Sequence, residues 1–305
     1  VIVSLVLFAI VAFLINSRNT IVENNIIQTG QRATLSSEIE QLRFYWQEIR
    51  VHNRDTMSEA GDEMLKAQIG LHDAFVTADQ HIETSILTSK MLSQDGRADL
   101  QRLQTLFSDY ESSLNISIDL LITLHQAYLD MPVFWQPLIN TLTSTSRIYG
   151  NSEPEWDTLS LSFSTDIEKF YDALSRIVGG RDLAEQTVAD KHLASINAFL
   201  TKYNHIEAIN NFKTQTFSQY ENLYYLAIDT ITKTKNESKL RSAIVGDATK
   251  IISATGLRQI KHTQNLNQQS LNASQNVQHT QIWSWFGAAL LSSIIAFLLA
   301  RSLNS

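Results

Sequence analysis

The sequence predicts an all-α protein: two stacked four-helix bundles that share a long first helix and a long last helix, flanked by two transmembrane helices. Three observations lead to this fold. The 305 residues include only 3 prolines and 10 glycines, which is too little punctuation for a sheet protein with many turns. Apolar residues recur at alternating intervals of three and four, the period of a helix in a bundle. An uncharged apolar run stands at each end of the chain.

The first apolar run, residues 1–16, predicts a transmembrane helix. A spanning helix needs about 20 apolar residues, so we interpret this run as a helix that has lost a few N-terminal residues. A secretory signal peptide is the alternative, but no small-residue cleavage site follows the run. A buried hairpin of the two apolar runs is disfavoured, because neither run carries a polar stripe.

The second apolar run, residues 282–300, is long enough to span a bilayer. Trp283 and Trp285 at its start fit an aromatic belt at one interface, and Arg301 at its end fits the positively charged cytoplasmic side. This orientation predicts a membrane-embedded protein of the bacterial inner (cell) membrane, with residues 17–281 in the periplasm.

The first long helix continues from the first apolar run to about Gly61, with Gly30 as a weak breaker on the way. Five of its residues are spaced 4, 3, 4 and 3 apart: Leu35, Ile39, Leu42, Trp46 and Ile49. That spacing is the seam of a left-handed helical bundle. We therefore expect these five side chains to be buried.

Further helices follow between recognisable breaks. We expect them at residues 63–92, 97–130, 133–149, 155–178, 182–203 and from 206 through the second apolar run. The breaks are residues 93–96, the prolines at 132 and 137, residues 150–154 and the glycines at 179 and 180. Two long helices with several shorter ones between them pack most economically as two bundles that share the long helices.

Two segments beside the apolar runs, residues 19–31 and 264–281, are rich in Asn and Gln and poor in large apolar residues. We interpret them as two antiparallel stalk helices, and disorder is the competing interpretation of this composition. If both helices leave the membrane at the same level, Arg43 faces the neighbourhood of Thr255. Arg50 then faces that of Ala248.

The composition excludes several classes of function. The formal net charge of −7 repels phosphate backbones, so we expect no nucleic-acid partner. The chain has no cysteine and carries no zinc-protease, serine-hydrolase or phosphate-loop motif. His52 with Asp55, and His72 with Asp73, are isolated pairs rather than clusters at metal-ligand spacing. We therefore expect no enzyme activity, no metal and no cofactor.

Four polar residues of the first long helix lie along one stripe, spaced 4, 3 and 4 apart: Arg43, Gln47, Arg50 and Arg54. Planar guanidinium groups hold a carboxylate through paired hydrogen bonds, so the stripe predicts an anion site. Trp46 would wall this site, while Thr255 and Arg258 would complete it from the last helix. The alternative is a solvated basic stripe that pairs with acids such as Glu40 and Glu48.

Aromatic residues near the central connector form a second candidate pocket. Its members are Tyr203, His205, Tyr220 and Tyr224, with Tyr225, Trp135 and Trp156 close by in the predicted fold. Aromatic residues at helical spacing are most often core residues. The alternative is an aromatic box for an amine or another cationic ligand.

The layout of the whole chain resembles the helical bimodular sensing domain of bacterial chemoreceptors and some sensor histidine kinases. That layout is a membrane helix, a long all-helical periplasmic region and a second membrane helix. The last seven residues, Leu-Ala-Arg-Ser-Leu-Asn-Ser, resemble the lead-in to a HAMP signal-relay helix. The resemblance therefore implies that residues 301–305 begin a cytoplasmic relay.

The resemblance implies a signal-transducing receptor of the methyl-accepting chemotaxis kind. Its sensing region would bind a small molecule, an organic acid or an amine, and would signal by a helix displacement. In such proteins arginines of the first helix and a hydroxyl of the last contact the ligand, and the sensing regions form homodimers. One alternative is the sensor region of a histidine kinase that reads a periplasmic binding protein. An interaction module without a pocket and a structural spacer also remain open.

Overall fold

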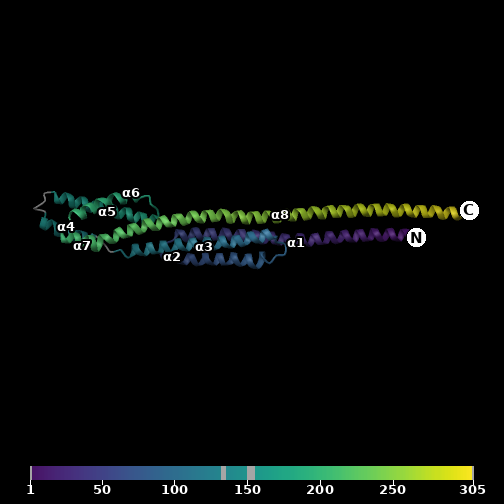
Figure 1. Cartoon of the computed structure of the whole chain (residues 1–305), viewed down its shortest axis with the longest axis horizontal. Coiled ribbons are helices and arrows are strands. Elements are labelled where there is room, and N and C mark those ends of the chain that lie inside the picture. The colour runs from purple at the N-terminus through teal and green to yellow at the C-terminus, as the bar shows by residue number, and fades with distance from the viewer. Residues whose placement is uncertain (1, 132–134, 150–154, 304–305) are drawn as a thin grey trace. The chain divides into compact units, whose positions relative to one another are not determined.

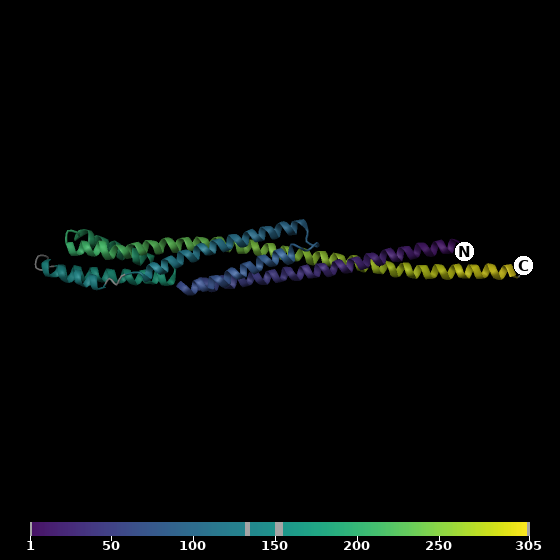
Figure 2. The ribbon, with the colours of Figure 1, turned by 90° about the horizontal axis from the view of Figure 1, so that it is seen from below.

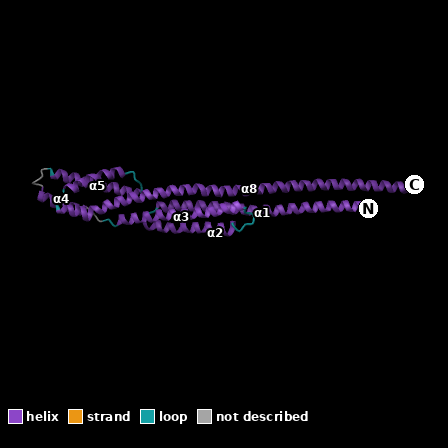
Figure 3. Cartoon of the chain, viewed as in Figure 1, coloured by secondary structure: helices purple, strands orange, loops and turns teal. Residues whose placement is uncertain are grey.

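The computed structural model describes residues 2–131, 135–149 and 155–303. Within these ranges the chain consists of helices joined by short turns, without any strand, so the predicted all-α class is confirmed (Figure 3). The predicted breaks at residue 132 and at residues 150–154 lie outside the described residues.

The two longest helices come first and last in the sequence, and the shorter helices come between them (Figure 1). In chain order the elements are α1 (Ile2–Ser58), α2 (Gly61–His81), the π-helix η1 (Ile82–Ile86), α3 (Gln94–Leu129), α4 (Trp135–Tyr149), α5 (Trp156–Gly180), α6 (Gln186–Lys202), α7 (Glu207–Phe212), the π-helix η2 (Lys213–Phe217) and α8 (Ser218–Leu303). The long first helix ends near Gly61, as predicted. Gly61 follows with a φ of +55°, a conformation that glycine adopts without steric cost.

The helix predicted at residues 63–92 ends earlier than expected. It passes through η1 and then opens into a turn before α3. Arg97 supports this turn, because its guanidinium donates to the carbonyls of Leu87 and Ser89. The backbone N–H of Gly96 donates to Ser93 Oγ at 3.1 Å. These two carbonyls, which would accept backbone N–H groups if the helix continued, thus accept hydrogen bonds from the Arg97 side chain instead.

The helix break predicted at Gly179 and Gly180 occurs just after these two residues. Both glycines belong to the last turn of α5, and the left-handed residue is Arg181, with a φ of 51°. The Arg181 guanidinium donates to the carbonyls of Met57, at 2.6 Å, and Glu59. These bonds satisfy backbone acceptors at the end of α1 and hold Arg181 in its unfavourable conformation.

The long last helix predicted from residue 206 is present, since α7, η2 and α8 follow one another without a gap, and a π turn at η2 is the one departure from a regular α-helix in this stretch. Phe212 and Phe217 are both buried, with ring centroids 6.4 Å apart. A π turn places residues five apart above one another. The extra residue of η2 therefore keeps both rings in the core.

The chain divides into two compact units. Unit 1 comprises Val1–Glu48, Val76–Thr105 and Asp247–Ser305, and unit 2 comprises Ile49–Phe75 and Leu106–Gly246. Both α1 and α8 contribute residues to each unit.

Unit 1 is built on the seam of α1. The predicted seam is confirmed, since its members are each at most 2% exposed: Leu35, Ile39, Leu42 and Trp46 in unit 1 and Ile49 in unit 2. The ends of α1 and α8 run side by side (Figures 1 and 2). Thr29 donates to Asn267 at 3.4 Å, and Trp46 donates to Thr249 at 3.3 Å. These contacts lie within about one helical turn of the predicted register.

Unit 2 holds an aromatic core. On α5 and α6, Phe163 and Phe199 stack with their centroids 4.0 Å apart. Phe170 of α5 reaches Tyr224 of α8, with centroids 5.6 Å apart. The apolar cluster continues from Leu124 to Ile231 in the sequence. Burial of such apolar surface is the main stabilising term in folding.

The predicted membrane location requires correction. A membrane-crossing helix needs an apolar stretch of about 20 residues. Among the residues that the structure describes, no helix contains a stretch that is long and apolar enough. This finding contradicts a membrane-embedded protein with residues 17–281 in the periplasm. Side chains in both predicted spans, those of residues 2–8 and 295–300 among them, lie outside the described part, as do residues 304–305 of the predicted relay.

Candidate functional site

The predicted arginine stripe on α1 faces solvent. All four of its members are exposed: Arg43, Gln47, Arg50 and Arg54. Arg43 pairs with Glu40 at 3.7 Å, and Arg54 pairs with Asp55 at 3.2 Å. These pairs agree with the alternative of a solvated basic stripe, and such exposed pairs stabilise a protein little.

The predicted partners on α8 contact each other and α3. Thr255 is 1% exposed, and Arg258 Nη2 donates to its hydroxyl at 3.5 Å. The same Nη2 atom donates to a carboxylate oxygen of Asp99. Arg258 is therefore neutralised by an acid of unit 1. Trp46 is buried and donates to Thr249, so its ring packs in the seam.

The predicted aromatic pocket lies within the core of unit 2. Tyr203 is 3% exposed, and its ring centroid is 5.3 Å from Trp156 and 4.8 Å from Phe199. Lys202 Nζ lies 4.8 Å from the centre of the Tyr203 ring. His205 is exposed, with its ring 6.4 Å from Tyr203. The ring face of Tyr203 thus already receives a cation from its own chain.

The other two tyrosines of this pocket are also core residues. Burial raises the pKa of Tyr220 to about 12, and burial together with a hydrogen bond to Asp190 raises the pKa of Tyr224. Tyr224 donates to Asp190 Oδ1 at 2.6 Å. The cavity beside Tyr220 measures only about 10 Å³, the space of a single water centre. The contacts fit core packing better than a ligand box.

A buried cation lies elsewhere in unit 2, at Arg241 of α8. The residue is 5% exposed. Its Nη1 donates to Ser117 Oγ at 2.7 Å, to Ser113 O at 2.9 Å and to Ser113 Oγ at 3.3 Å. Within the described part of the chain, the acceptors of Arg241 are all uncharged. A guanidinium held in this way keeps its full charge without a bonded counter-charge.

Polar residues of α1 and α3 extend this region. Asn53 Nδ2 donates to the hydroxyl of Tyr110 at 2.8 Å, and Asn53 Oδ1 is buried with no hydrogen-bond partner in the structure. We call the set Asn53, Tyr110, Ser113, Ser117 and Arg241 the Arg241 centre. Tyr110 links the two parts of this set, because it accepts the hydrogen bond of Asn53 and interacts electrostatically with Arg241. A buried acceptor without a partner is uncommon in folded proteins.

The electrostatics of the Arg241 centre follow from burial. Burial lowers the pKa of Arg241, while Tyr110 and Glu237 counteract this effect. Burial raises the pKa of Tyr110, with an opposing effect from Arg241 and Arg50. The pKa shifts show that loss of water, rather than a close counter-charge, dominates at both side chains.

The sequence carried a signal for this centre that the predictions missed. Ile244, Ala248 and Ile251 are seam residues of α8, spaced 4 and 3 apart. Arg241 precedes Ile244 by three residues and therefore continues the same seam. A charged residue at a seam position is the pattern that marks a buried charge.

No known protein family, curated protein or solved structure matches this chain.

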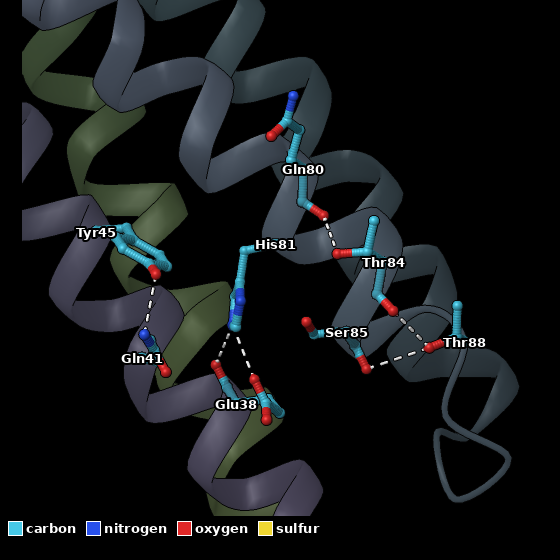
Figure 4. Close-up of polar contacts among 8 residues, drawn as sticks. All are labelled: Glu38, Gln41, Tyr45, Gln80, His81, Thr84, Ser85 and Thr88. Carbon is cyan, nitrogen blue, oxygen red and sulfur yellow. Dashed lines mark hydrogen bonds and ion pairs between the residues drawn. The ribbon is translucent and has the colours of Figure 1, made fainter.

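A second polar cluster lies in unit 1, where α2 meets η1 (Figure 4). His81 Nε2 lies 2.8 Å from the backbone oxygen of Glu38 and 3.5 Å from its carboxylate. The ring of Tyr45 meets His81 edge-on at 5.2 Å, and Gln41 donates to the Tyr45 hydroxyl at 2.9 Å. These contacts tie the end of α2 to α1, so we interpret the cluster as a packing contact.

Threonine hydroxyls accompany the π turn that follows His81. Thr84 donates to the carbonyl of Gln80 at 2.7 Å, and Thr88 donates to the carbonyl of Thr84 at 2.8 Å (Figure 4). Thr88 also lies 3.4 Å from the carbonyl of Ser85. The side chains satisfy carbonyls where the regular helical ladder changes to η1.

A Ser, a His and an Asp come together on α5 and α6, but not in a catalytic order. His192 Nδ1 lies 2.8 Å from Asp166 Oδ1, and Ser195 Oγ donates to Asp166 Oδ2 at 2.5 Å. A nucleophilic serine donates to the histidine instead. Ser195 is therefore not activated in this arrangement. Among the described residues, no group of three or more His, Asp or Glu side chains is placed to hold a metal ion.

Proposed function

We propose that this chain is the ligand-sensing region of a signal-transducing receptor of the helical bimodular kind, and that it binds a small organic acid. In this proposal the two units are stacked four-helix bundles that share α1 and α8. The receptor is a chemotaxis protein or a sensor kinase, and it works as a homodimer.

The observation that carries the proposal is the buried cation of the Arg241 centre. A buried charge without a bonded counter-charge costs free energy, and a bound ligand of opposite charge would offset that cost. A carboxylate would supply the missing charge and accept paired hydrogen bonds from the guanidinium. The unpartnered Asn53 Oδ1 would accept a hydrogen bond from a donor group of the same ligand. Some of the hydrogen bonds that Arg241 donates to Ser113 and Ser117 would then be lost.

The same contacts suggest how binding leads to a signal. Arg241 belongs to α8, whereas its serine partners belong to α3. A ligand that accepts hydrogen bonds from the guanidinium replaces some of those between Arg241 and the serines, and so weakens the contact between α8 and α3. Binding therefore favours a packing in which α8 is displaced, and the differential affinity for the two packings transmits the signal.

The test is calorimetric titration of the whole chain with acetate, succinate, citrate and benzoate, together with thermal unfolding. A ligand at one hundred times its dissociation constant stabilises the folded state by about 2.7 kcal/mol. We expect at least one acid to bind. Arg241→Gln should abolish binding, because it removes the charge and keeps a polar side chain.

Exposed arginines supply the controls. Arg102→Gln alters an arginine whose side chain is 66% exposed, and Arg43→Ala alters the predicted stripe at an arginine whose side chain is 57% exposed. Both variants should bind the acid as the parent chain does. Retained binding in Arg241→Gln, or no binding of any acid to the folded chain, would refute the proposal. The second outcome would favour docking of a separate ligand-binding protein.

A further inference from the structure

A cleft lies between α2 and α3 in unit 2, and none of its lining residues belongs to the Arg241 centre. It measures about 350 Å³, within the range of small-molecule sites. Four polar and two aliphatic side chains line it: Gln68, Ile69, Leu71, His72, Glu111 and Asn115. A cleft of this size suits a ligand of a few heavy atoms.

The four polar residues form two cross-helix pairs. His72 Nδ1 lies 2.7 Å from Glu111 Oε1, and Gln68 Nε2 donates to Asn115 Oδ1 at 2.8 Å. On each helix the two members are four residues apart, so they share a face. The two pairs therefore lie side by side along the cleft.

Each pair keeps one donor and one acceptor for a ligand. His72 retains its Nε2 atom, and Asn115 retains its amide NH2 group as a donor. Glu111 retains its second carboxylate oxygen, and Gln68 retains its amide oxygen. The hydrogen bond that the His72 ring donates to Glu111 raises the pKa of His72, which favours the protonated ring with an N–H at Nε2. When the His72 ring is protonated, positive and negative charge lie next to each other in one cleft.

We propose that this cleft binds a free α-amino acid with an aliphatic side chain. The carboxylate of the amino acid accepts hydrogen bonds from His72 Nε2 and the Asn115 amide. Its ammonium group donates to Glu111 and to the Gln68 amide oxygen. The aliphatic side chain covers Ile69, which is 66% exposed in the structure.

The paired charges favour a zwitterion over a singly charged ligand. A carboxylic acid would bring its negative charge next to Glu111 without an ammonium group to offset the repulsion. An amine would meet the protonated His72 ring in the same way. Only a ligand with both groups satisfies both sides of the cleft. The cleft and the Arg241 centre differ in residues and in ligand charge, so either site can fail without the other.

Three matched ligands test the charge requirement by calorimetric titration of the whole chain. The probe is L-leucine, 4-methylpentanoate lacks its ammonium group, and 3-methylbutylamine lacks its carboxylate. We expect L-leucine to bind and each analogue to bind at least about tenfold more weakly. Equal affinity for all three ligands, or no binding of L-leucine, would overturn the proposal.

Glu111→Gln tests the site itself, because it removes the negative charge and preserves the size of the side chain. L-leucine should bind this variant at least about tenfold more weakly. Glu168→Gln is the matched control, since Glu168 is an exposed residue of α5 that does not line the cleft. Circular dichroism verifies that both variants are folded.

A second variant, Asn115→Leu, removes the amide that faces the carboxylate and should also weaken L-leucine binding. Arg241→Gln should leave L-leucine binding unchanged while it abolishes organic-acid binding, which separates this inference from the proposed function. Full affinity in both cleft variants would refute the amino-acid site.

Discussion

Arg241 and His72 show how the surroundings of one residue decide its role. Both side chains are basic, but Arg241 is 5% exposed and bonded to neutral acceptors, whereas the His72 side chain is 62% exposed and paired with an acid. Water screens the second charge and cannot reach the first. Substitutions at the two positions should therefore have different effects.

Replacing Arg241 by Met should leave the free energy of unfolding unchanged or raise it by up to about 3 kcal/mol. A well-packed apolar side chain removes the cost of a buried charge that has no bonded counter-charge. The hydroxyl of Ser117 keeps its bond to the carbonyl of Ser113. Urea unfolding measures the difference.

The control is Arg102→Met at an exposed position, which should change the free energy by less than about 0.5 kcal/mol. A loss of more than about 1 kcal/mol in Arg241→Met would show that the cation stabilises the bundle. The charge would then need no ligand to explain it.

His72 should titrate above its ordinary pKa of 6.5, because the hydrogen bond and the charge of Glu111 favour the protonated ring. Since the folded pKa exceeds the unfolded one, this contact stabilises the protein below about pH 6.5. The stabilisation is lost as the pH rises through the folded value. NMR titration of the His72 ring should show the raised pKa. Glu111→Gln should return it toward 6.5, and an unchanged value would contradict the assignment.

At the scale of the element, glycine has opposite effects at the start and in the middle of α2. Gly61 stands at the start with a φ of +55°, and an added Cβ would lie 3.1 Å from the His125 ring. Gly70 lies inside the helix, and an added Cβ would be 3.8 Å from the His52 ring, an ordinary contact. The first position needs glycine, and the second gains nothing from its flexibility.

Gly61→Ala should therefore lower the free energy of unfolding by about 1–2 kcal/mol, since a side chain is strained at positive φ. Gly70→Ala should raise it by about 0.5–1 kcal/mol through higher helix propensity. Urea unfolding of the pair measures both effects. Effects of the same sign would contradict the assigned backbone conformations.

At the scale of the whole molecule, burial is distributed unevenly. Residues 35–49 contain the buried seam of α1. Residues 19–31 of α1 and 264–281 of α8 are mostly exposed, apart from Asn25. Segments with few buried apolar contacts open more readily than packed ones. One helix thus contains a stable part and a weak part.

Hydrogen exchange measured by mass spectrometry should reveal this difference. In buffer, amides of residues 19–31 and 264–281 should exchange faster than those of residues 35–49 by at least about a factor of ten. Residues 35–49 serve as the internal control because they belong to the same helix as the first segment. Equal protection along α1 would show that another contact covers the exposed segments.

The sequence by itself determined the helical class, the seam of α1 and the position where α1 ends. These features are local: the 3.6-residue period selects the buried face, and a glycine at positive φ follows the end of the helix. It also determined that Arg241 continues a seam, although that signal was missed.

Only the tertiary structure decided that Arg241 is buried and what it contacts. Arg241 meets Ser113 across 128 positions in the sequence, and no local rule specifies such a pairing. The same holds for Arg181, whose left-handed conformation is supported by carbonyls at the end of α1. It holds for η2, which keeps two phenylalanine rings in one core. In each case contacts between distant segments outweigh local preference, because burial and hydrogen bonding depend on which helices pack together and in which register.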